Sequence, residues 1–250
     1  MIQNRFHLAT RTARLTALAV LAAGLAGCQS MAGAPQIAQV RVIDASPDAP
    51  ALDIYQNSPS QAAPAGLYNI GFGTVSSYMP IAPGAYTHAA YTAGTQQQLA
   101  AIRGTFSTNG QYTVLAGNIA ANLQMTVLKD QSTPAPAGQT ALRFLGQATR
   151  AGAIDIYLLP PGFSLAGASP IATGVGFGSN TGYLNEPSGT YSIVAFPSGA
   201  VPSATTPTYT GSQVSYPGTS VRTIVLIDQP AATPGLQIIT ADDYDAPSAS

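Results

Sequence analysis

The amino-acid sequence predicts an all-β protein with two tandem immunoglobulin-like β-sandwich domains. Three observations support this prediction: turn formers outnumber charged residues, apolar residues alternate along short segments, and one set of motifs occurs twice. The 250 residues include 25 Gly and 20 Pro, but only 9 Lys and Arg and 10 Asp and Glu. A helical bundle needs charged outer faces and few helix breakers, so this composition favours short strands joined by turns.

The same composition excludes some classes of protein. Nucleic-acid binding depends on many Lys and Arg contacts to phosphates, and the formal net charge of this chain is −1. We therefore expect no nucleic-acid partner. A wholly disordered chain combines low hydrophobicity with high net charge, whereas 46% of these residues are hydrophobic. A packed core is expected.

The N-terminal segment has the pattern of a signal peptide over residues 1–27. The first 14 residues contain three arginines and no acidic residue, and residues 15–27 are uncharged and apolar or small. This apolar run is shorter than the roughly 20 residues that a membrane-spanning helix requires. It is therefore expected to direct export and then to be removed.

The predicted signal ends at the only cysteine of the chain, Cys28, which follows Leu25-Ala26-Gly27. These four residues resemble the bacterial lipobox, in which the thiol is acylated and the chain is cut before the cysteine. The resemblance implies a lipoprotein whose Cys28 carries palmitate-type acyl chains and holds the protein at a membrane. Gln29 follows, and in Gram-negative bacteria a residue other than Asp there favours the outer membrane. An ordinary signal peptide followed by a free thiol is the alternative.

Several motifs recur about a hundred residues apart. Three pairs of identical residues lie 102 positions apart: Arg41 and Arg143, Asp53 and Asp155, and Tyr55 and Tyr157. The Gly-Phe-Gly motif at 71–73 recurs at 176–178, at a spacing of 105. Solenoid repeats have about 20 to 50 residues, so a period this long indicates one small domain per copy.

The predicted domain organisation follows from this repeat. After the signal, residues 28–38 form a flexible tether, residues 39–131 the first sandwich and residues 140–241 a second, diverged sandwich. Residues 132–139 are a Pro-rich linker, because proline cannot donate a hydrogen bond to a sheet. Residues 242–250 are expected to be a solvated tail of acidic and small residues.

Within each copy the apolar pattern has a period of two, which is the period of a half-buried strand. Leu52 and Ile54 point to one side of such a strand, while Asp53 and Tyr55 point to the other. The other expected strands are 86–91, 100–106, 112–116 and 124–128 in the first copy, and 191–196, 221–227 and 236–240 in the second. Short strands separated by Gly and Pro are typical of a β-sandwich.

One part of the first copy is distinctive. Ala45-Ser46-Pro47-Asp48-Ala49-Pro50 lies between two expected strands, and the segments 71–78 and 83–86 follow with their glycines and tyrosines. Together these segments resemble the DUF4397 family, whose members are exported bacterial domains that often occur in tandem and on lipoproteins. The resemblance covers residues 39 to about 130 well and the second copy more weakly.

The chain departs from the family pattern at three places. The family usually has His where this chain has Asp44, and an acid where it has Thr74. The second copy has residues 146–150 in place of the distinctive turn. The resemblance implies a fold and a location, and it implies no activity.

The sequence offers few groups for catalysis or for metal binding. His88 is the only histidine after the signal, and the chain has no Gly-x-Ser-x-Gly motif, so a Ser-His-Asp triad is not expected. With Cys28 acylated, one histidine cannot provide the three or four N and S ligands of a zinc site. We expect no cofactor. Alternation places His88 on one strand face with Tyr86 and Ala90, and a surface or partly covered position is expected. The Gly-Phe-Gly elements lack Gly-x-Gly-x-x-Gly and are expected to form bends.

Three carboxylates lie within ten residues of one another: Asp44, Asp48 and Asp53. Short acids beside Ser, Pro and Ala can cap turns through the backbone amides. The same group could supply oxygen ligands to a hard cation such as Ca²⁺. It could also supply the paired carboxylates of glycoside hydrolysis. All three alternatives stay open at this point.

The duplicated charges are expected to be structural. Arg41 with Asp53, and Arg143 with Asp155, are predicted to form a cross-strand ion pair within each sandwich, with a ligand contact as the alternative. Twelve Tyr residues against seven Phe and no Trp leave phenol groups for strand surfaces, where Tyr is a favoured contact residue.

Two functions from different classes follow. The favoured one is a lipid-anchored cell-envelope protein with a non-catalytic binding, adhesive or scaffolding role, whose partner is an envelope protein or polysaccharide. The alternative is an enzyme or enzyme accessory that acts on envelope polysaccharide through Asp44, Asp48 or Asp53.

Overall fold

The computed structural model describes residues 37–57, 65–202, 205–230 and 235–244. The predicted signal peptide, Cys28 and most of the predicted tether lie outside the described residues. Within the described part, the chain forms strands and one short 3-10 turn, Ala120–Asn122. The predicted all-β sandwich class is confirmed. The described residues contain no helix with the length and apolar character needed to cross a membrane.

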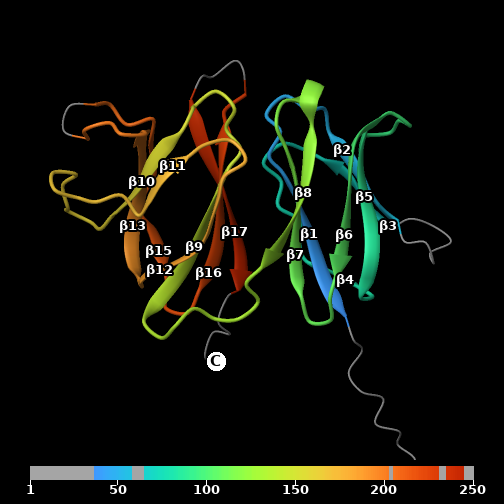
Figure 1. Cartoon of the computed structure of the whole chain (residues 1–250), viewed down its shortest axis with the longest axis horizontal. Coiled ribbons are helices and arrows are strands. Elements are labelled where there is room, and N and C mark those ends of the chain that lie inside the picture. The colour runs from blue at the N-terminus through green and yellow to red at the C-terminus, as the bar shows by residue number, and fades with distance from the viewer. Residues whose placement is uncertain (1–36, 58–64, 203–204, 231–234, 245–250) are drawn as a thin grey trace, which may run out of the picture. The chain divides into compact units, whose positions relative to one another are not determined.

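The N-terminal sandwich consists of two four-stranded sheets (Figure 1). One sheet has the order β4-β1-β7-β8, with β4 at Met79–Ile81, β1 at Ala38–Asp44, β7 at Gln111–Gly117 and β8 at Gln124–Asp130. The other has the order β3-β2-β5-β6, with β3 at Ala65–Ile70, β2 at Leu52–Asn57, β5 at Gly84–Thr92 and β6 at Gln98–Phe106. β1 and β7 run parallel, and the other neighbours are antiparallel.

The C-terminal sandwich repeats this order. One sheet is β12-β9-β16-β17, with β12 at Asn180–Pro187, β9 at Gln139–Gly146, β16 at Val221–Asp228 and β17 at Leu236–Tyr244. The other contains β11 at Ala172–Val175, β10 at Ile154–Leu159 and β13 at Gly189–Pro197, and two short strands, β14 at Tyr209–Thr210 and β15 at Val214–Tyr216, both pair with β13. β9 and β16 run parallel, as β1 and β7 do.

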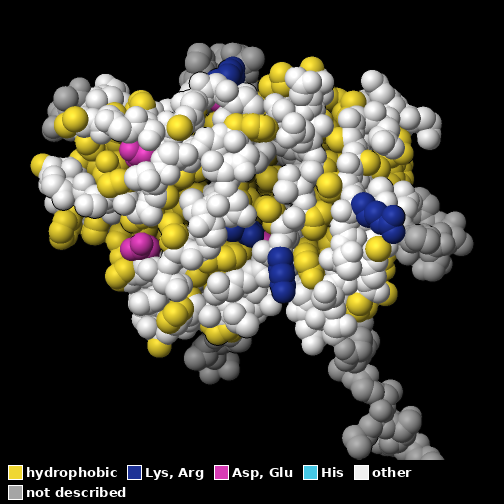
Figure 2. Space-filling view, viewed as in Figure 1, with side chains coloured by type: hydrophobic (Ala, Val, Ile, Leu, Met, Phe, Trp, Pro, Cys, Tyr) yellow, Lys and Arg dark blue, Asp and Glu magenta, His cyan; other side chains and the backbone are white. Residues whose placement is uncertain are grey.

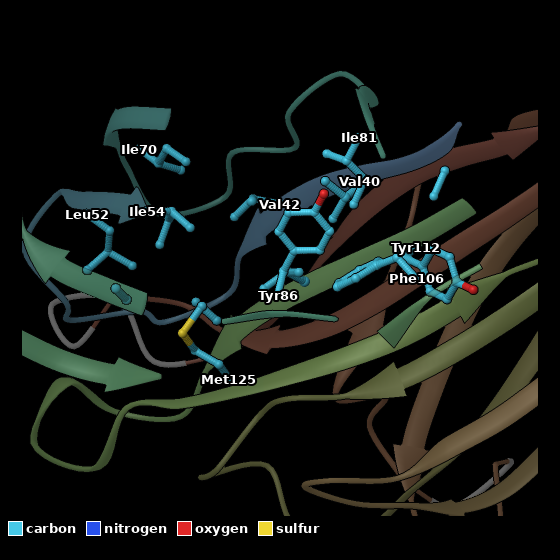
Figure 3. Packing of buried hydrophobic residues seen from close by; sticks show 14 of the residues in the cluster. Val40, Val42, Leu52, Ile54, Ile70, Ile81, Tyr86, Phe106, Tyr112 and Met125 are labelled. Carbon is cyan, nitrogen blue, oxygen red and sulfur yellow. The ribbon is translucent and has the colours of Figure 1, made fainter. Parts of the chain in front are cut away.

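Each sandwich has its own hydrophobic core, built from the alternate apolar residues of its strands. Figure 3 shows the first core, in which Val40, Val42, Leu52 and Ile54 from β1 and β2 pack with the aromatic side chain of Phe106. The second core includes Leu142, Phe144, Ile154, Ile156, Ile193 and Ile224. Each large side chain that is fully buried in this way contributes about 1.5–3 kcal/mol to folding. The molecular surface in Figure 2 carries few charged side chains, in keeping with the composition.

The two Gly-Phe-Gly elements form turns, as predicted. Gly73 and Gly178 have φ angles of 81° and 78°, a left-handed conformation that favours glycine. The amide of Thr74 donates to the carbonyl of Gly71, and the amide of Ser179 donates to that of Gly176. The second turn also makes a close contact, because a Cβ atom at position 146 would lie 1.9 Å from the carbonyl oxygen of Gly176.

The prediction of a solvated C-terminal tail is wrong for residues 242–244. β17 continues through residues 242–244, where Asp242 pairs with Arg222 and Tyr244 pairs with Val221 of β16. Asp243 is only 3% exposed. Residues 245–250 lie outside the described residues.

Candidate functional site

Four charged side chains form a buried cluster that draws on both sandwiches. Arg41 comes from β1, Asp130 from β8, Arg143 from β9 and Asp243 from β17, and each is at most 4% exposed. Arg41 forms an ion pair with Asp243, and its Nη2 atom also lies 3.8 Å from an oxygen of Asp130. Nη2 of Arg143 lies 2.6 Å from Asp130 and 4.0 Å from Asp243. Each arginine therefore pairs with an aspartate of the other sandwich.

The hydroxyl groups around this ionic cluster are also duplicated. Thr113 Oγ1 accepts from Arg41 Nε at 2.9 Å and donates to Asp130 at 2.6 Å. Thr223 has the same role toward Arg143 and Asp243, at 3.0 and 2.6 Å. The hydroxyls of Tyr78 and Tyr183 donate to Asp130 and Asp243, at 2.7 and 2.6 Å. Each tyrosine ring lies 4.7 Å from the guanidinium carbon of the arginine in its own sandwich.

The electrostatics of the cluster suit a structural role. Burial opposes the charge on Arg41, but the charges of Asp243 and Asp130 outweigh it and raise the pKa of Arg41. Burial and the charge of Asp130 raise the pKa of the Tyr78 hydroxyl, and burial and the charge of Asp243 raise the pKa of Tyr183. Two cations and two anions balance one another, and their hydrogen bonds are made within the protein. Such a cluster can join two domains, and it offers no free group to a substrate.

Asp53 and Asp155 do not pair with the arginines, so the predicted ion pair within each sandwich is wrong. The two oxygens of Asp53 accept from the amides of Asn69 and Gly94, each at 2.8 Å. Asp155 accepts from three groups of the equivalent segments in the second sandwich: the amides of Gly174 and Gly199 and the hydroxyl of Ser198. Partial burial opposes ionisation, but these hydrogen bonds outweigh it and lower the pKa of Asp155. Each duplicated aspartate therefore joins an edge strand, β3 or β11, to the loop that follows β5 or β13.

Asp44 and Asp48 also bind backbone amides. Asp44 is fully buried and accepts from the amide of Ser46 at 3.0 Å, while its second oxygen has no hydrogen-bond partner among the described residues. Burial raises the pKa of Asp44 to about 6. Asp48 is exposed and accepts from the amide of Ala120 at 2.8 Å. Only Asp44 caps its own turn, because Asp48 and Asp53 bind amides of segments that are distant in the sequence. The described residues contain no group of three or more His, Cys, Asp or Glu side chains that could hold a metal ion.

In the second sandwich, the contact that corresponds to Asp48 with Ala120 is made in the reverse direction. The carboxylate there belongs to Asp228, and the amide donors belong to Thr149 and Arg150. Asp228 is the last residue of β16 and is 2% exposed. It accepts from the amide and hydroxyl of Thr149 at 2.7 and 2.9 Å and from the amide of Arg150. Arg150 stands in the repeat where the first copy has Asp48. The carboxylate has thus moved from one loop to the other, and a search for a second Asp-Ala-Pro turn misses Asp228.

His88 is buried, contrary to the expected surface or partly covered position. It is 1% exposed, and its Nε2 atom lies 3.1 Å from Oε1 of Gln56. Burial lowers the pKa of His88 to about 4. The alternation with Tyr86 and Ala90 is correct, but the face that they share is the core face of β5. His88 is a neutral core residue at neutral pH.

A group of tyrosines lies on the outer side of the β3-β2-β5-β6 sheet. Tyr55, Tyr68 and Tyr91 form what we call the tyrosine cluster. Tyr55 meets Tyr68 at a ring-centroid distance of 5.7 Å and Tyr91 at 5.3 Å, both edge to face. Tyr68 is 62% exposed, and the other two rings are partly exposed. The hydroxyl of Tyr91 donates to Oε1 of Gln98.

The second sandwich covers the equivalent surface with its own chain. Tyr157 and Phe196, which correspond to Tyr55 and Tyr91, meet edge to face at 5.7 Å and are 5% and 0% exposed. Together with Val194 they pack against four partly buried residues: Leu159, Leu165, Ala168 and Ala200. The same aromatic pair is therefore closed in one sandwich and open in the other.

Two solved structures that resemble this chain are distant likenesses. A carbohydrate-binding module of family CBM26 from Eubacterium rectale Amy13K, solved with maltoheptaose, is 11% identical, with 84% of this chain and 98% of that chain covered and a TM-score of 0.27. A leucine-rich repeat protein from Bacteroides thetaiotaomicron is also 11% identical, with 78% of this chain and 26% of that chain covered and a TM-score of 0.20. Likenesses at these TM-scores carry no information about function.

The family comparison agrees with the resemblance seen in the sequence. A search of curated proteins found no match. The model of DUF4397, described as a domain of unknown function, matches residues 38–157. This stretch holds every strand of the N-terminal sandwich, together with β9 and the first four residues of β10 from the next. The chain therefore contains a DUF4397 domain, which begins at the first strand of the structure.

Proposed function

We propose that the protein is a non-catalytic binding protein of the cell envelope, and that its partner binds the outer face of the β3-β2-β5-β6 sheet. The observation that carries this proposal is the open tyrosine cluster. Tyrosine combines a large apolar ring with a hydrogen-bonding group, and it is enriched where binding energy is concentrated. The C-terminal sandwich closes the same aromatic pair with its own loops, whereas Tyr68 is 62% exposed in the N-terminal one.

The buried ionic cluster suits this role, because it joins the two sandwiches without using either outer sheet. Its four charged side chains lie on β1, β8, β9 and β17, and the surrounding threonines lie on β7 and β16. Of the two tyrosines, Tyr183 lies on β12 and Tyr78 directly precedes β4. An apolar group that includes Ile43, Leu115, Leu145 and Val225 adds contacts between the same strands. A binding face held on such a body resists reorientation under load, which an adhesive or scaffolding protein requires.

The lipid anchor at Cys28 forms the second part of the proposal. The lipobox resemblance supports it, and the tether would separate the sandwiches from an outer membrane in a Gram-negative host. In cells, Cys28→Ser should release the protein from the membrane fraction and remove its labelling by a palmitate analogue. A Cys28→Ser protein that stays in the membrane fraction with unchanged mass would contradict the anchor.

One observation favours the enzyme alternative, namely the raised pKa of Asp44. A carboxyl group with a pKa of about 6 is suited to general acid catalysis. However, Asp44 has no exposed surface, and Asp48 and Asp53 bind the backbone of separate loops. The binding role is therefore supported better than polysaccharide hydrolysis by these aspartates.

The binding role can be tested by photo-crosslinking in cells. A photo-reactive phenylalanine analogue at position 68 replaces one exposed ring by another of similar size. We expect it to capture a specific partner from the envelope. The matched control is the same substitution at Thr173, the exposed residue that corresponds to Tyr68 in the second sandwich. Equal capture from both positions, or none from position 68, would contradict the proposal.

A further inference from the structure

The geometry points to an uncharged polysaccharide as the ligand of the tyrosine cluster, lying across β2, β5 and β6 with a sugar ring against Tyr68. This inference rests on the proposed binding role and names its ligand class. It follows from three features of the N-terminal sandwich: the residues that differ from the closed face of the second sandwich, the rows of side chains on the sheet, and the charge of the face.

The first feature is the comparison with the closed face. Val194 and Phe196 of the C-terminal sandwich correspond to Ala89 and Tyr91 of the N-terminal one. The C-terminal set is covered by the apolar side chains of Leu159, Leu165, Ala168 and Ala200. Ala89 and Val194 are both only 3% exposed, whereas Tyr91 is partly exposed and Phe196 is 0% exposed, so the accessible difference is the ring of Tyr91 with its hydroxyl. The N-terminal face therefore suits a ligand that is apolar on one side and hydrogen-bonding at its edges.

The second feature is the pattern of rows across the sheet. Tyr55, Ala89 and Ala101 are aligned on three neighbouring strands and form an outward apolar row. Tyr55 is partly exposed and Ala101 is exposed, whereas Ala89 between them is only 3% exposed. Two positions further along, Asn57, Thr87 and Arg103 form an outward polar row. The two rows are about 7 Å apart, since a strand advances about 3.4 Å per residue. A sugar chain has this division too, with C–H groups on the faces of its rings and hydroxyl groups at their edges.

Tyr68 extends the apolar row to the edge strand β3. Gly66 pairs with Tyr55, and a Cβ atom at position 66 would lie 3.2 Å from the ring carbon and the hydroxyl of Tyr68. The glycine thus allows the phenol ring to fold back over the strand. The other side of the ring is open to solvent, as its exposure of 62% shows. An exposed flat ring is the surface against which a sugar face can stack.

The third feature is charge. Asp53 and Arg103 are the only Asp, Glu, Lys or Arg residues on β2, β3, β5 and β6. Both oxygens of Asp53 already bind backbone amides, which leaves one exposed cation on the face. A polyanion needs many cationic contacts to bind tightly. The face therefore favours an uncharged polymer, whose hydroxyls Asn57, Thr87 and Arg103 can bind.

The test is affinity electrophoresis of the full chain in gels containing an α-glucan, a β-glucan or a mannan, with alginate as the polyanionic control. We expect at least one uncharged polysaccharide to retard the protein and alginate not to do so. Tyr68→Ala should weaken that retardation about tenfold, as expected for the loss of one aromatic contact. Thr173→Ala, on the second sandwich, should leave it unchanged. Both side chains are exposed, so both variants should keep the thermal unfolding midpoint of the wild type.

Each other outcome has a distinct meaning. If no uncharged polysaccharide retards the protein while position 68 crosslinks to a polypeptide in cells, the ligand class is wrong and the binding role stands. If retardation is seen but Tyr68→Ala leaves it intact, the assigned face is wrong. If neither retardation nor crosslinking occurs, the binding role fails together with the ligand class.

Discussion

The two sandwiches share their strand order and differ in what covers their outer sheets. In the C-terminal sandwich, Tyr157 and Phe196 are buried under residues of the neighbouring loops. In the N-terminal sandwich, Tyr55 and Tyr91 keep the same edge-to-face contact but stay partly exposed beside Tyr68. The contrast shows that the same aromatic pair can be closed by its own chain or left open, and the proposed binding role rests on the open copy.

The outer sheets of the two copies differ, but the surface where the copies meet does not, because both copies contribute the same groups to it. Arg41 pairs with Asp243 and Arg143 pairs with Asp130, so each sandwich neutralises the arginine of the other. This reciprocity is that of a two-fold symmetric interface, in which residue i contacts j and j contacts i. Neither sandwich alone provides its arginine with the short ion pair seen here. Stability should therefore depend on both copies equally.

The largest expected effect comes from breaking this reciprocity. Arg143→Ala leaves Asp130 buried without its closest cation, and removing one partner of a buried ion pair costs about 3–5 kcal/mol. Arg41→Ala should cost a similar amount because of Asp243. Urea unfolding of the full chain measures both losses. Arg103→Ala is the control, since Arg103 is exposed and should change stability by less than about 0.5 kcal/mol. A loss below about 1 kcal/mol at both buried arginines would contradict a stabilising role for the cluster.

A second difference between the sandwiches concerns pH. Asp44 and His88 are buried and titratable, whereas the C-terminal sandwich has Gly146 and Ile193 at the corresponding positions. The pKa of His88 is lowered from 6.5 to about 4, so its contribution to stability is present above pH 6.5 and is lost as the pH falls toward 4. The pKa of Asp44 is raised from 3.8 to about 6, so its contribution is present below pH 3.8 and is lost as the pH rises through 6. The two effects oppose each other over the same range.

Removing one group should expose the pH dependence of the other. Each shift corresponds to about 3 kcal/mol across its range. The double variant His88→Ile with Gln56→Leu copies the C-terminal sandwich, and relative to wild type it should gain stability as the pH falls from 6.5 to 4. Asp44→Asn should lose stability relative to wild type over the interval from 6 to 3.8. Urea unfolding at several pH values measures both differences. Variant and wild-type curves that stay parallel would show that these groups do not titrate as their burial requires.

A smaller effect separates the two loop contacts. Asp228 is 2% exposed and receives three hydrogen bonds from Thr149 and Arg150, whereas the exposed Asp48 receives one from Ala120. Asp228→Ala should destabilise the protein by about 2–3 kcal/mol, because it leaves buried donors unpaired. Asp48→Ala should cost about 1 kcal/mol or less. Thermal unfolding midpoints rank the two variants. A larger loss for Asp48→Ala would reverse the assigned roles.

The fold could be predicted from the sequence because its signals are local. Two of these signals lie within short segments, namely the alternation in residues 52–55 and the repeated Gly-Phe-Gly turns. The third, the spacing of about a hundred residues, reveals the duplication itself. The partners of Arg41 could not be found in this way, since Asp243 lies 202 positions away. The cross-strand prediction chose Asp53, which is near in sequence but binds the amides of Asn69 and Gly94.

Two signals in the sequence could have corrected this choice. The repeat aligns Met125 with Ile238, and extending it by five residues aligns Asp130 with Asp243. In addition, Asp243 continues the alternation of Ile239 and Ala241, which all lie on the buried side of β17. The acidic composition of the C-terminal residues hid this pattern. The difference between the open and closed outer faces could not be predicted. The alternation of apolar residues shows which face of a strand is buried, but it does not show where the loops that cover the second face will pack.

The smallest effect tests the contrast between the outer faces directly. Tyr91→Phe and Ala89→Val give the N-terminal face the side chains of the C-terminal one. Tyr91 donates its hydroxyl to an exposed Gln98, so removing that hydroxyl should change stability by less than about 0.5 kcal/mol. Retardation by an uncharged polysaccharide should nevertheless weaken in the double variant, since the face loses the hydroxyl group of Tyr91 and gains two methyl groups at position 89. Tyr191→Phe is the matched control, because its hydroxyl also binds an exposed acceptor, the carbonyl of Pro187, on the other sandwich. If the double variant bound as well as wild type, these two positions would not distinguish the open face from the closed one, and Tyr68 would account for the difference.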